Sequence, residues 1–158
     1  MDNFSVTSPA FKNGEYIPIK YSGIGENISI PLAFHNIDPR GKSIAIIMDD
    51  PDAPTPKPFV HWLIWNIPTS ITSIPEDIPP SEIVLTLDGA LQGKNTTGEV
   101  GYIGPNPPSG THVYKIKAYV LDYFLDIEAG STKEELEKEM EGHILQSSLL
   151  EGKFSHQE

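Results

Sequence analysis

The sequence contains no cysteine. This absence excludes disulfide bonds, a thiol nucleophile, CxxC redox chemistry and any zinc or iron–sulfur site built on thiolates. Long hydrophobic runs are missing too, because the longest, at residues 44–48, has five residues, whereas a membrane-spanning helix needs about 20. We therefore expect a fold without disulfides and without stable membrane insertion.

Positive charge is scarce. Eleven Lys and Arg face 22 Asp and Glu, which gives a net charge of −11. Such a chain repels phosphate backbones and anionic lipid headgroups at long range, so we expect neither nucleic-acid binding nor docking on anionic membranes. The first four residues, Met1–Phe4, show no basic and then apolar stretch of the kind found in signal peptides. The expected location is cytoplasmic.

Turn-forming residues are abundant, with 15 Pro and 13 Gly, while 38% of the residues are hydrophobic. This combination indicates many short strands and turns rather than disorder. A length of 158 residues is typical of one domain with a sizeable core. We expect a single domain over residues 1–158.

Short runs rich in β-branched and aromatic residues recur between clusters of turn formers, a pattern that predicts strands. The predicted strands are residues 16–21, 42–49, 60–67, 83–87 and 111–121. The continuous apolar stretch Ile44–Met48 favours a central strand that is covered on both faces.

Helical periodicity appears only near the C-terminus. Residues Ser131–Glu134 have the spacing of a capping box, in which a Ser hydroxyl and a Glu carboxylate each accept a helix N–H. An apolar stripe follows at Leu136, Met140, Ile144 and either Ser148 or Leu149. The pattern predicts a C-terminal helix of about four turns that packs on a sheet.

The first group of candidate functional residues follows the strand at 42–49. Asp49, Asp50 and Asp52 lie in a proline-rich loop, and His61 begins the next strand-like run. Loops at strand ends often present functional groups from a rigid scaffold. Ordinary turn chemistry for the aspartates, with a half-buried structural His61, is the alternative interpretation.

The second group lies in residues 101–114. Three glycines and three prolines stiffen this segment, whose backbone N–H groups are able to point at an anion. His112 and Tyr114 are two residues apart, so on a strand they face the same side. A turn followed by a strand with ordinary surface side chains explains the same pattern.

Several enzyme signatures are missing. The sequence has no G-x-S-x-G elbow and no H-E-x-x-H helix. Residues 89–95 lack both the glycine spacing and the Ser or Thr of a phosphate-binding P-loop, and Gly23 and Gly25 have no third glycine of a dinucleotide loop. We therefore do not expect an enzyme on the basis of local motifs.

Taken together, these segments resemble the phosphatidylethanolamine-binding protein family, in the bacterial and archaeal branch that includes proteins similar to Raf kinase inhibitor protein. The motifs that carry the resemblance are residues 50–54, 61–68 and 104–114, with further similarity at 21–29, 91–95 and 141–145. They occur in the family's order and extend the resemblance from about Phe11 to Phe154.

The resemblance implies a mainly β fold of two packed sheets, a β-sandwich, with a C-terminal helix and short peripheral helices. It also implies a ligand pocket for a phosphate, a phosphorylated headgroup or a similar small anion. The family's pocket positions correspond here to Asp50, His61, Gly104, Pro105, His112 and Tyr114, with Asp52 beside them. No cofactor, metal ligand or catalytic residue is expected.

Two departures from the family's pattern concern the ligand. Val113 stands where the family usually carries Arg, which removes a phosphate contact, and Phe154 stands where relatives often have Tyr. Some relatives inhibit kinases and others serine carboxypeptidases, so the resemblance implies a kinase or protease partner. The alternative function is a hydrolase that uses Asp50, Asp52, His61 and His112 as a metal site or an acid–base pair.

A further expectation concerns the loop before His61. Four prolines crowd residues 50–58, where the chain must turn back on itself. We expect at least one cis X–Pro bond there, with Ala53–Pro54 and Lys57–Pro58 as the best candidates.

Overall fold

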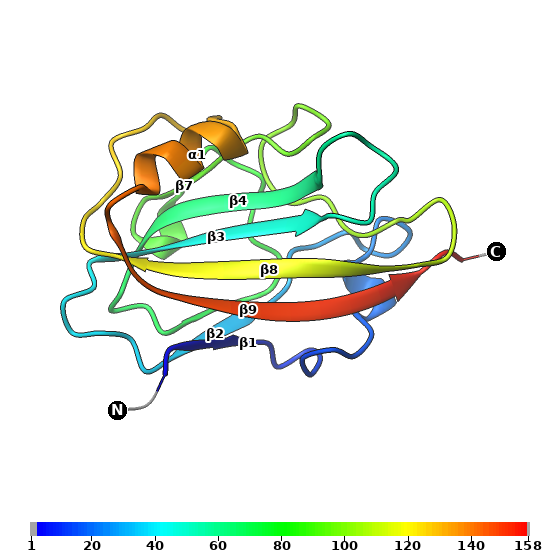
Figure 1. The fold of residues 1–158 in the computed structure, drawn as a ribbon, viewed down its shortest axis with the longest axis horizontal. Coiled ribbons are helices and arrows are strands. Elements are labelled where there is room, and N and C mark those ends of the chain that lie inside the picture. Colours follow the sequence, from blue (N-terminus) through cyan, green and yellow to red (C-terminus); the bar gives the residue numbers. More distant parts are fainter. Residues whose placement is uncertain (1–2, 158) are drawn as a thin grey trace.

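The computed structural model describes residues 3–157, and its strands form two antiparallel sheets (Figure 1). The larger sheet has the strand order β6-β7-β4-β3-β8-β9, and the smaller has β1-β2-β5. The strands are β1 (Ser5–Thr7), β2 (Leu32–His35), β3 (Ser43–Asp50), β4 (Phe59–Pro68), β5 (Ser73–Ile74), β6 (Ile83–Val84), β7 (Ala90–Gln92), β8 (Thr111–Leu121) and β9 (Ile144–Ser155). The helices are α1 (Lys133–Met140) and the 3-10 helices η1 (Ile19–Tyr21) and η2 (Leu85–Leu87).

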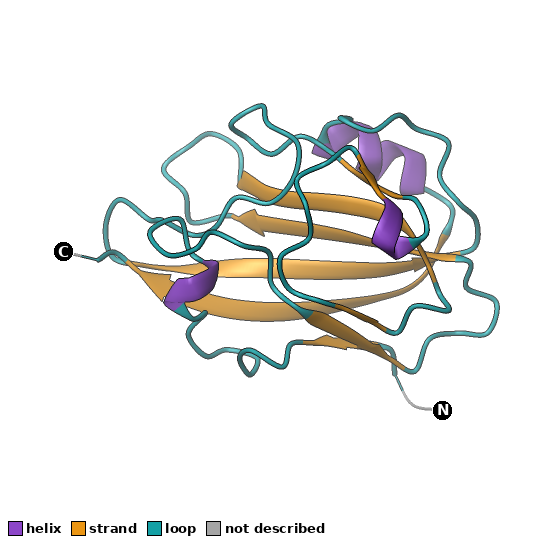
Figure 2. Cartoon of the chain, turned by 180° about the vertical axis from the view of Figure 1, so that it is seen from behind, coloured by secondary structure: helices purple, strands orange, loops and turns teal. Residues whose placement is uncertain are grey.

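This architecture confirms the expected mainly β fold with two packed sheets, one α-helix and short peripheral helices. The small sheet and both 3-10 helices lie on the face of the large sheet that is nearer the viewer in Figure 2. Helix α1 lies on the opposite face. Residues 1 and 2 of the N-terminal stretch considered above, and residue 158, lie outside the described residues.

The three central strands form where the sequence predicts them, at β3, β4 and β8. β3 is hydrogen-bonded to β4 on one side and to β8 on the other. All eight of its residues are buried, because a strand with neighbours at both edges and cover on both faces has no route to solvent. The continuous apolar run Ile44–Met48 is the sequence signature of this position.

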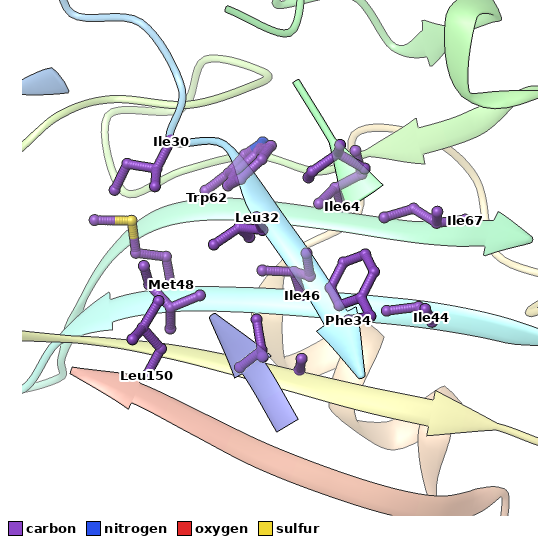
Figure 3. Close-up of a cluster of buried hydrophobic side chains, with 14 of the residues drawn as sticks. Ile30, Leu32, Phe34, Ile44, Ile46, Met48, Trp62, Ile64, Ile67 and Leu150 are labelled. Carbon is purple, nitrogen blue, oxygen red and sulfur yellow. The ribbon is translucent and has the colours of Figure 1, made fainter. Parts of the chain in front are cut away.

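Alternate residues of β3 face two separate hydrophobic cores. Ile44, Ile46 and Met48 point at the small sheet and lie opposite Leu32 and Phe34 of β2 (Figure 3). The intervening residues of β3 face the other way and pack under α1. This alternation, which follows from the two-residue period of a strand, also gives the two acidic residues at the end of β3 opposite directions.

The predicted strand at residues 16–21 is wrong. Tyr16 forms only an isolated bridge to Lys153, and residues 19–21 form the 3-10 helix η1. Pro18 has no N–H to donate to a neighbouring strand, so strand pairing cannot continue through it. The predicted strand at 83–87 is likewise limited to the two residues of β6, after which the chain turns into η2.

The C-terminal helix is shorter than the sequence predicts. It spans eight residues, and the capping box joins Thr132 to Glu135, one residue later than expected. Ser131 instead donates its hydroxyl to the Glu128 carbonyl at 2.6 Å. Gly142, at a φ of 79°, ends the helical region, and residues 144–155 form β9 along the whole length of β8.

No helix within residues 3–157 is long and apolar enough to cross a membrane.

Candidate functional site

The two candidate loops lie at the same end of the large sheet, on the right in Figure 1. Because neighbouring strands are antiparallel, the end of β3 lies beside the starts of β4 and β8. Residues 51–58 connect β3 to β4, and residues 101–110 lead into β8. A cavity of about 290 Å³ lies between these segments.

Five of the seven residues expected in the pocket line this cavity: Asp50, His61, Gly104, His112 and Tyr114. Asp52 and Pro105 are not part of its lining. Sequence reasoning missed the remaining lining residues, which are Ala53, Pro54, Thr55, Phe59, Ile103, Asn106, Pro107 and Pro108. Three of them are prolines, and the prolines of the two motifs are the signal that could have placed these segments at the cavity wall.

Asp50 and His112 form a buried pair at the base of the site. The His112 ring donates from Nδ1 to Asp50 Oδ2 at 2.6 Å, and the two side chains are 10% and 4% exposed, respectively. The other carboxylate oxygen accepts the backbone N–H of Asp52 at 2.8 Å. Asp50 therefore fixes the orientation of the imidazole, and Nε2 is the ring nitrogen left for a ligand.

His61 is held differently. Its Nδ1 donates to the Ile103 carbonyl at 2.7 Å, and its ring packs between Phe59 and Tyr114 at centroid distances of 4.7 and 5.1 Å. Burial lowers the pKa of His61 below its ordinary value, against the opposing influence of the Ile103 carbonyl. A neutral ring with its proton on Nδ1 presents Nε2 as an acceptor, so His61 is suited to a ligand that carries a donor group.

The lowered pKa of His61 predicts a loss of stability in mild acid. Between the folded pKa and 6.5, its ordinary value, the unfolded chain binds more protons than the folded one, so the free energy of unfolding falls as the pH falls. We expect this fall between pH 7 and pH 5 to be smaller in His61→Asn, which does not titrate. Urea denaturation at pH 7, 6 and 5 measures it, with the exposed His35→Asn as control. Equal pH slopes for the wild type and His61→Asn would contradict this assignment.

Tyr114 supplies a hydroxyl that has no hydrogen-bond partner among the described residues. Its side chain is 1% exposed yet lines the cavity. Burial raises its pKa well above the ordinary value, so the group stays protonated through the neutral range. The Tyr114 hydroxyl is therefore a donor available to a ligand.

Backbone donors near Gly104 were expected to contribute to the pocket, and this expectation is wrong for Gly104 itself. Its N–H donates to Asn27 Oδ1 at 2.7 Å, and the Pro105 carbonyl accepts from the N–H of Gly23 at 2.8 Å. These groups attach the loop at 101–110 to the segment at 21–29. Asn27 is a supporting residue that sequence reasoning missed, although the motif around it was noticed.

Asp52 holds two chain segments together and does not line the cavity. It is exposed, and its Oδ2 accepts the backbone N–H of Val113 at 2.9 Å. This bond ties the loop at 51–58 to the start of β8.

The expected cis X–Pro bond in residues 50–58 is wrong, because every peptide bond within residues 3–157 is trans. The loop turns by hydrogen bonds such as Asp52 N–H to Asp50 instead.

The cavity carries little positive charge of its own. Its lining contains one carboxylate, two imidazoles and a phenol, and no Lys or Arg. Within residues 3–157, no group of three or more His, Asp and Glu side chains is placed to hold a metal ion. The donors and acceptors present suit a ligand with a single negative charge, or one that carries both an anionic and a cationic group.

Comparison with known proteins shows a family match along nearly the whole chain. The model of the family described as phosphatidylethanolamine-binding protein matches residues 7–155. A UPF0098 protein of Methanothermobacter thermautotrophicus is 44% identical over 145 residues, which cover 92% of this chain and 94% of the relative. A UPF0098 protein of Pyrococcus abyssi is 46% identical over 149 residues, covering 93% of this chain and 83% of the relative.

Solved structures agree with the sequence match. A phosphatidylethanolamine-binding protein homologue from Chlamydia trachomatis superposes with a TM-score of 0.90 at 36% identity, covering 99% of this chain and 100% of that one. YbcL of E. coli, described as a member of the mammalian family, superposes with a TM-score of 0.91 at 27% identity and the same coverage. The fold and the sequence therefore lead to the same family.

Proposed function

Because the chain belongs to the phosphatidylethanolamine-binding protein family, we propose that it is a non-enzymatic binding protein whose cavity holds a phosphate group or a phosphorylated headgroup. The observation that carries the proposal is that an imidazole fixed by a carboxylate and a phenol without a partner among residues 3–157 meet at one small cavity. The Tyr114 hydroxyl is the donor for one phosphoryl oxygen, and His112 Nε2 is the donor for another when the ring carries both protons, as an imidazolium paired with Asp50. Each hydrogen bond to a charged group contributes about 1.5–3 kcal/mol.

The acceptors of the cavity narrow the ligand class. Asp50 carries a negative charge, and the neutral His61 ring presents a lone pair. A phosphate dianion meets repulsion from both, whereas a monoanion is able to donate its P–O–H to His61. A phosphoethanolamine group adds an ammonium for Asp50. Phosphorylated headgroups of this zwitterionic kind are therefore the preferred ligands, ahead of free phosphate.

The test is titration calorimetry with phosphoethanolamine and inorganic phosphate at fixed ionic strength. We expect Tyr114→Phe to weaken phosphoethanolamine binding by roughly tenfold to a hundredfold, because one hydrogen bond to a charged group, about 1.5–3 kcal/mol, is lost. Stability should stay unchanged, since the hydroxyl has no protein partner among the described residues. Tyr16→Phe, at a ring 55% exposed elsewhere on the surface, is the control. Equal affinities for wild type and Tyr114→Phe would reject the cavity as the binding site.

An acid–base hydrolase is the second candidate, and the Asp50–His112 pair is the observation that favours it. A buried carboxylate that orients an imidazole at 2.6 Å is the arrangement used for general-base catalysis. Its test is turnover of phosphoesters and peptides by the purified protein. Turnover that His112→Ala abolishes would replace the binding proposal, and binding without turnover would reject the hydrolase.

The proposed function includes inhibition of a kinase or a serine protease by the surface around the cavity. Pro54 and Pro108 line the cavity and are exposed, so they are the rigid part of the rim that a protein partner would meet. Inhibition assays with and without phosphoethanolamine test this point. If a partner enzyme uses this rim, the ligand should change the inhibition.

A further inference from the structure

A second polar cavity lies on the other face of the large sheet. Asp49 follows Met48 and precedes Asp50, so its side chain points away from the first cavity. Lys117 lies on β8, and Lys133 is the first residue of α1. Together they line a cavity of about 590 Å³.

The charges of this cluster do not balance. Asp49 is 1% exposed, and its Oδ2 accepts from Lys133 Nζ at 2.9 Å and from Lys117 Nζ at 3.2 Å. Two ammonium groups thus share one oxygen of one carboxylate, which leaves a positive charge without compensation. Each ammonium also has two further N–H donors that bond to no described residue. The cluster therefore keeps several charged donors that no residue in the described part of the chain uses.

The desolvation of Lys133 makes this excess charge more effective. Its side chain is only 14% exposed, and charge–charge interactions strengthen where water is excluded. Burial alone would lower the pKa of Lys133, but the hydrogen bond to Asp49 raises it above the ordinary value. The side chain stays an ammonium in the neutral range.

The pattern of hydrogen bonds is not that of a closed structural ion cluster. Asp49 Oδ1 is buried and accepts no hydrogen bond from any residue in the described part of the chain, although buried polar groups are normally satisfied. Two neutral donors, the hydroxyls of Tyr119 and Ser147, belong to residues that line the same cavity and have no described partner either. Burial raises the pKa of Tyr119, which keeps it a donor.

Acidic groups near the cluster set the size of the net charge. Lys115, which also lines the cavity, lies 3.8 Å from Glu151, so its charge has an acidic neighbour of its own. Glu134 and Glu137 of α1 act on Lys133 from farther away. Lys117 and Lys133 against Asp49 leave one positive charge, which Glu134 and Glu137 reduce, and Glu137 also acts on Tyr119. A small anion held mainly by hydrogen bonds from the ammonium and hydroxyl groups matches this balance.

We propose that the cavity formed by Lys117, Lys133, Tyr119 and Ser147 binds a small phosphate-type oxyanion. Two ammonium groups and two hydroxyls are able to surround tetrahedral oxygens from several directions. The site lies on the opposite side of the sheet from the Asp50–His112 cavity and uses none of its residues. Its occupation therefore does not depend on the function proposed above.

The first experiment uses the wild-type protein, with inorganic phosphate as the probe and amide chemical shifts as the readout at constant ionic strength. Saturable shifts are expected at residues 117, 119, 133 and 147. Shifts confined to residues around Asp50 and His112 would overturn this proposal and leave the function of the first cavity intact. Shifts confined to the residues of this second cavity, with none around Asp50 and His112, would support this proposal and would reject phosphate binding in the first cavity.

Removing a positive charge and removing the negative charge of Asp49 should change anion affinity in opposite directions. This difference separates anion binding from a purely structural role of the Lys–Asp cluster. Lys133→Gln and Lys117→Gln should each weaken phosphate binding at this site roughly tenfold, while Lys138→Gln, on the exposed surface of α1, should not. Asp49→Asn should tighten binding severalfold, because it removes the competing negative charge. Weaker binding in Asp49→Asn, or unchanged binding in both lysine variants, would overturn the proposal. Thermal unfolding of each variant identifies any that fail to fold, and Lys117→Gln serves if Lys133→Gln is one of these.

Discussion

His112→Ala is expected to weaken phosphoethanolamine binding by about 2–3 kcal/mol, roughly 30-fold to 150-fold. The substitution removes the imidazole donor and leaves the buried Asp50 carboxylate facing the phosphoryl group with one oxygen unpaired. For the same reason, the free energy of unfolding should fall by about 2 kcal/mol. Titration calorimetry and urea denaturation measure the two effects.

A double-mutant cycle shows whether the unpaired carboxylate causes these losses. Asp50→Asn in the His112→Ala background removes the unpaired negative charge. It should recover part of the stability and part of the affinity for inorganic phosphate, a ligand that has no ammonium for Asp50. His35→Ala, which removes an exposed histidine bonded to Thr7, is the matched control and should change neither. If the double variant is as weak as the sum of the single variants, the two side chains act independently and the pairing argument fails.

The central part of the fold was predictable because local and long-range preferences agree there. The runs at residues 42–49, 60–67 and 111–121 are β-branched and apolar, and they occupy strands with neighbours on both sides. Antiparallel pairing of these strands brings Asp50, His61 and His112 together, and the sequence predicted this only through the family resemblance. The family resemblance added the pocket itself.

The edge of the sheet was not predictable in the same way. Residues 144–149 continue the apolar spacing of α1, and the local sign that the helix stops before them is Gly142. The decision comes from β8, which offers a full row of backbone partners from Thr111 to Leu121. Pairing with a strand more than 20 residues away in the sequence is a tertiary effect that overrides local periodicity.

Hydrogen-bond use in the loops could not be inferred from composition either. The glycines and prolines at 101–110 indicated a rigid segment with exposed backbone donors, but the Gly104 N–H is taken by Asn27. Which donors remain free depends on a segment about 80 residues earlier. The positions of side chains on strands follow from alternation, whereas the partners of loop backbone atoms follow only from the folded structure.

The end of β3 is the point where both candidate cavities originate. Asp49 and Asp50 are consecutive, and each is buried on its own face of the sheet with its own cationic or imidazole partner. Two buried carboxylates in sequence are costly, because each needs compensation to offset its desolvation. Asp50 has one partner, the imidazole of His112. Asp49, on the opposite face, has two lysine partners, so positive charge is in excess there. This difference suits a zwitterion or monoanion to the first cavity and an oxyanion to the second.

Gly104→Ala is expected to lower the free energy of unfolding by about 3 kcal/mol and to abolish phosphoethanolamine binding. A Cβ at this position would collide with the Tyr21 carbonyl oxygen and lie 2.7 Å from the Ser22 carbonyl carbon. Both obstacles are backbone, so the two segments must separate, and overpacking of this kind costs about 1–3 kcal/mol or more. The bond from Gly104 N–H to Asn27 would break with them, and the loop would lose its place at the cavity.

Gly110→Ala is the matched control for this prediction, because it lies in the same loop. Gly110 has a φ of 65°, yet a Cβ there would meet nothing within 4 Å. Its cost is only the left-handed backbone conformation, about 1 kcal/mol, and binding should persist. Urea denaturation and calorimetry on both variants give the comparison. Equal stability losses would mean that backbone conformation, and not the close approach of the 21–29 segment, is what requires glycine in this loop.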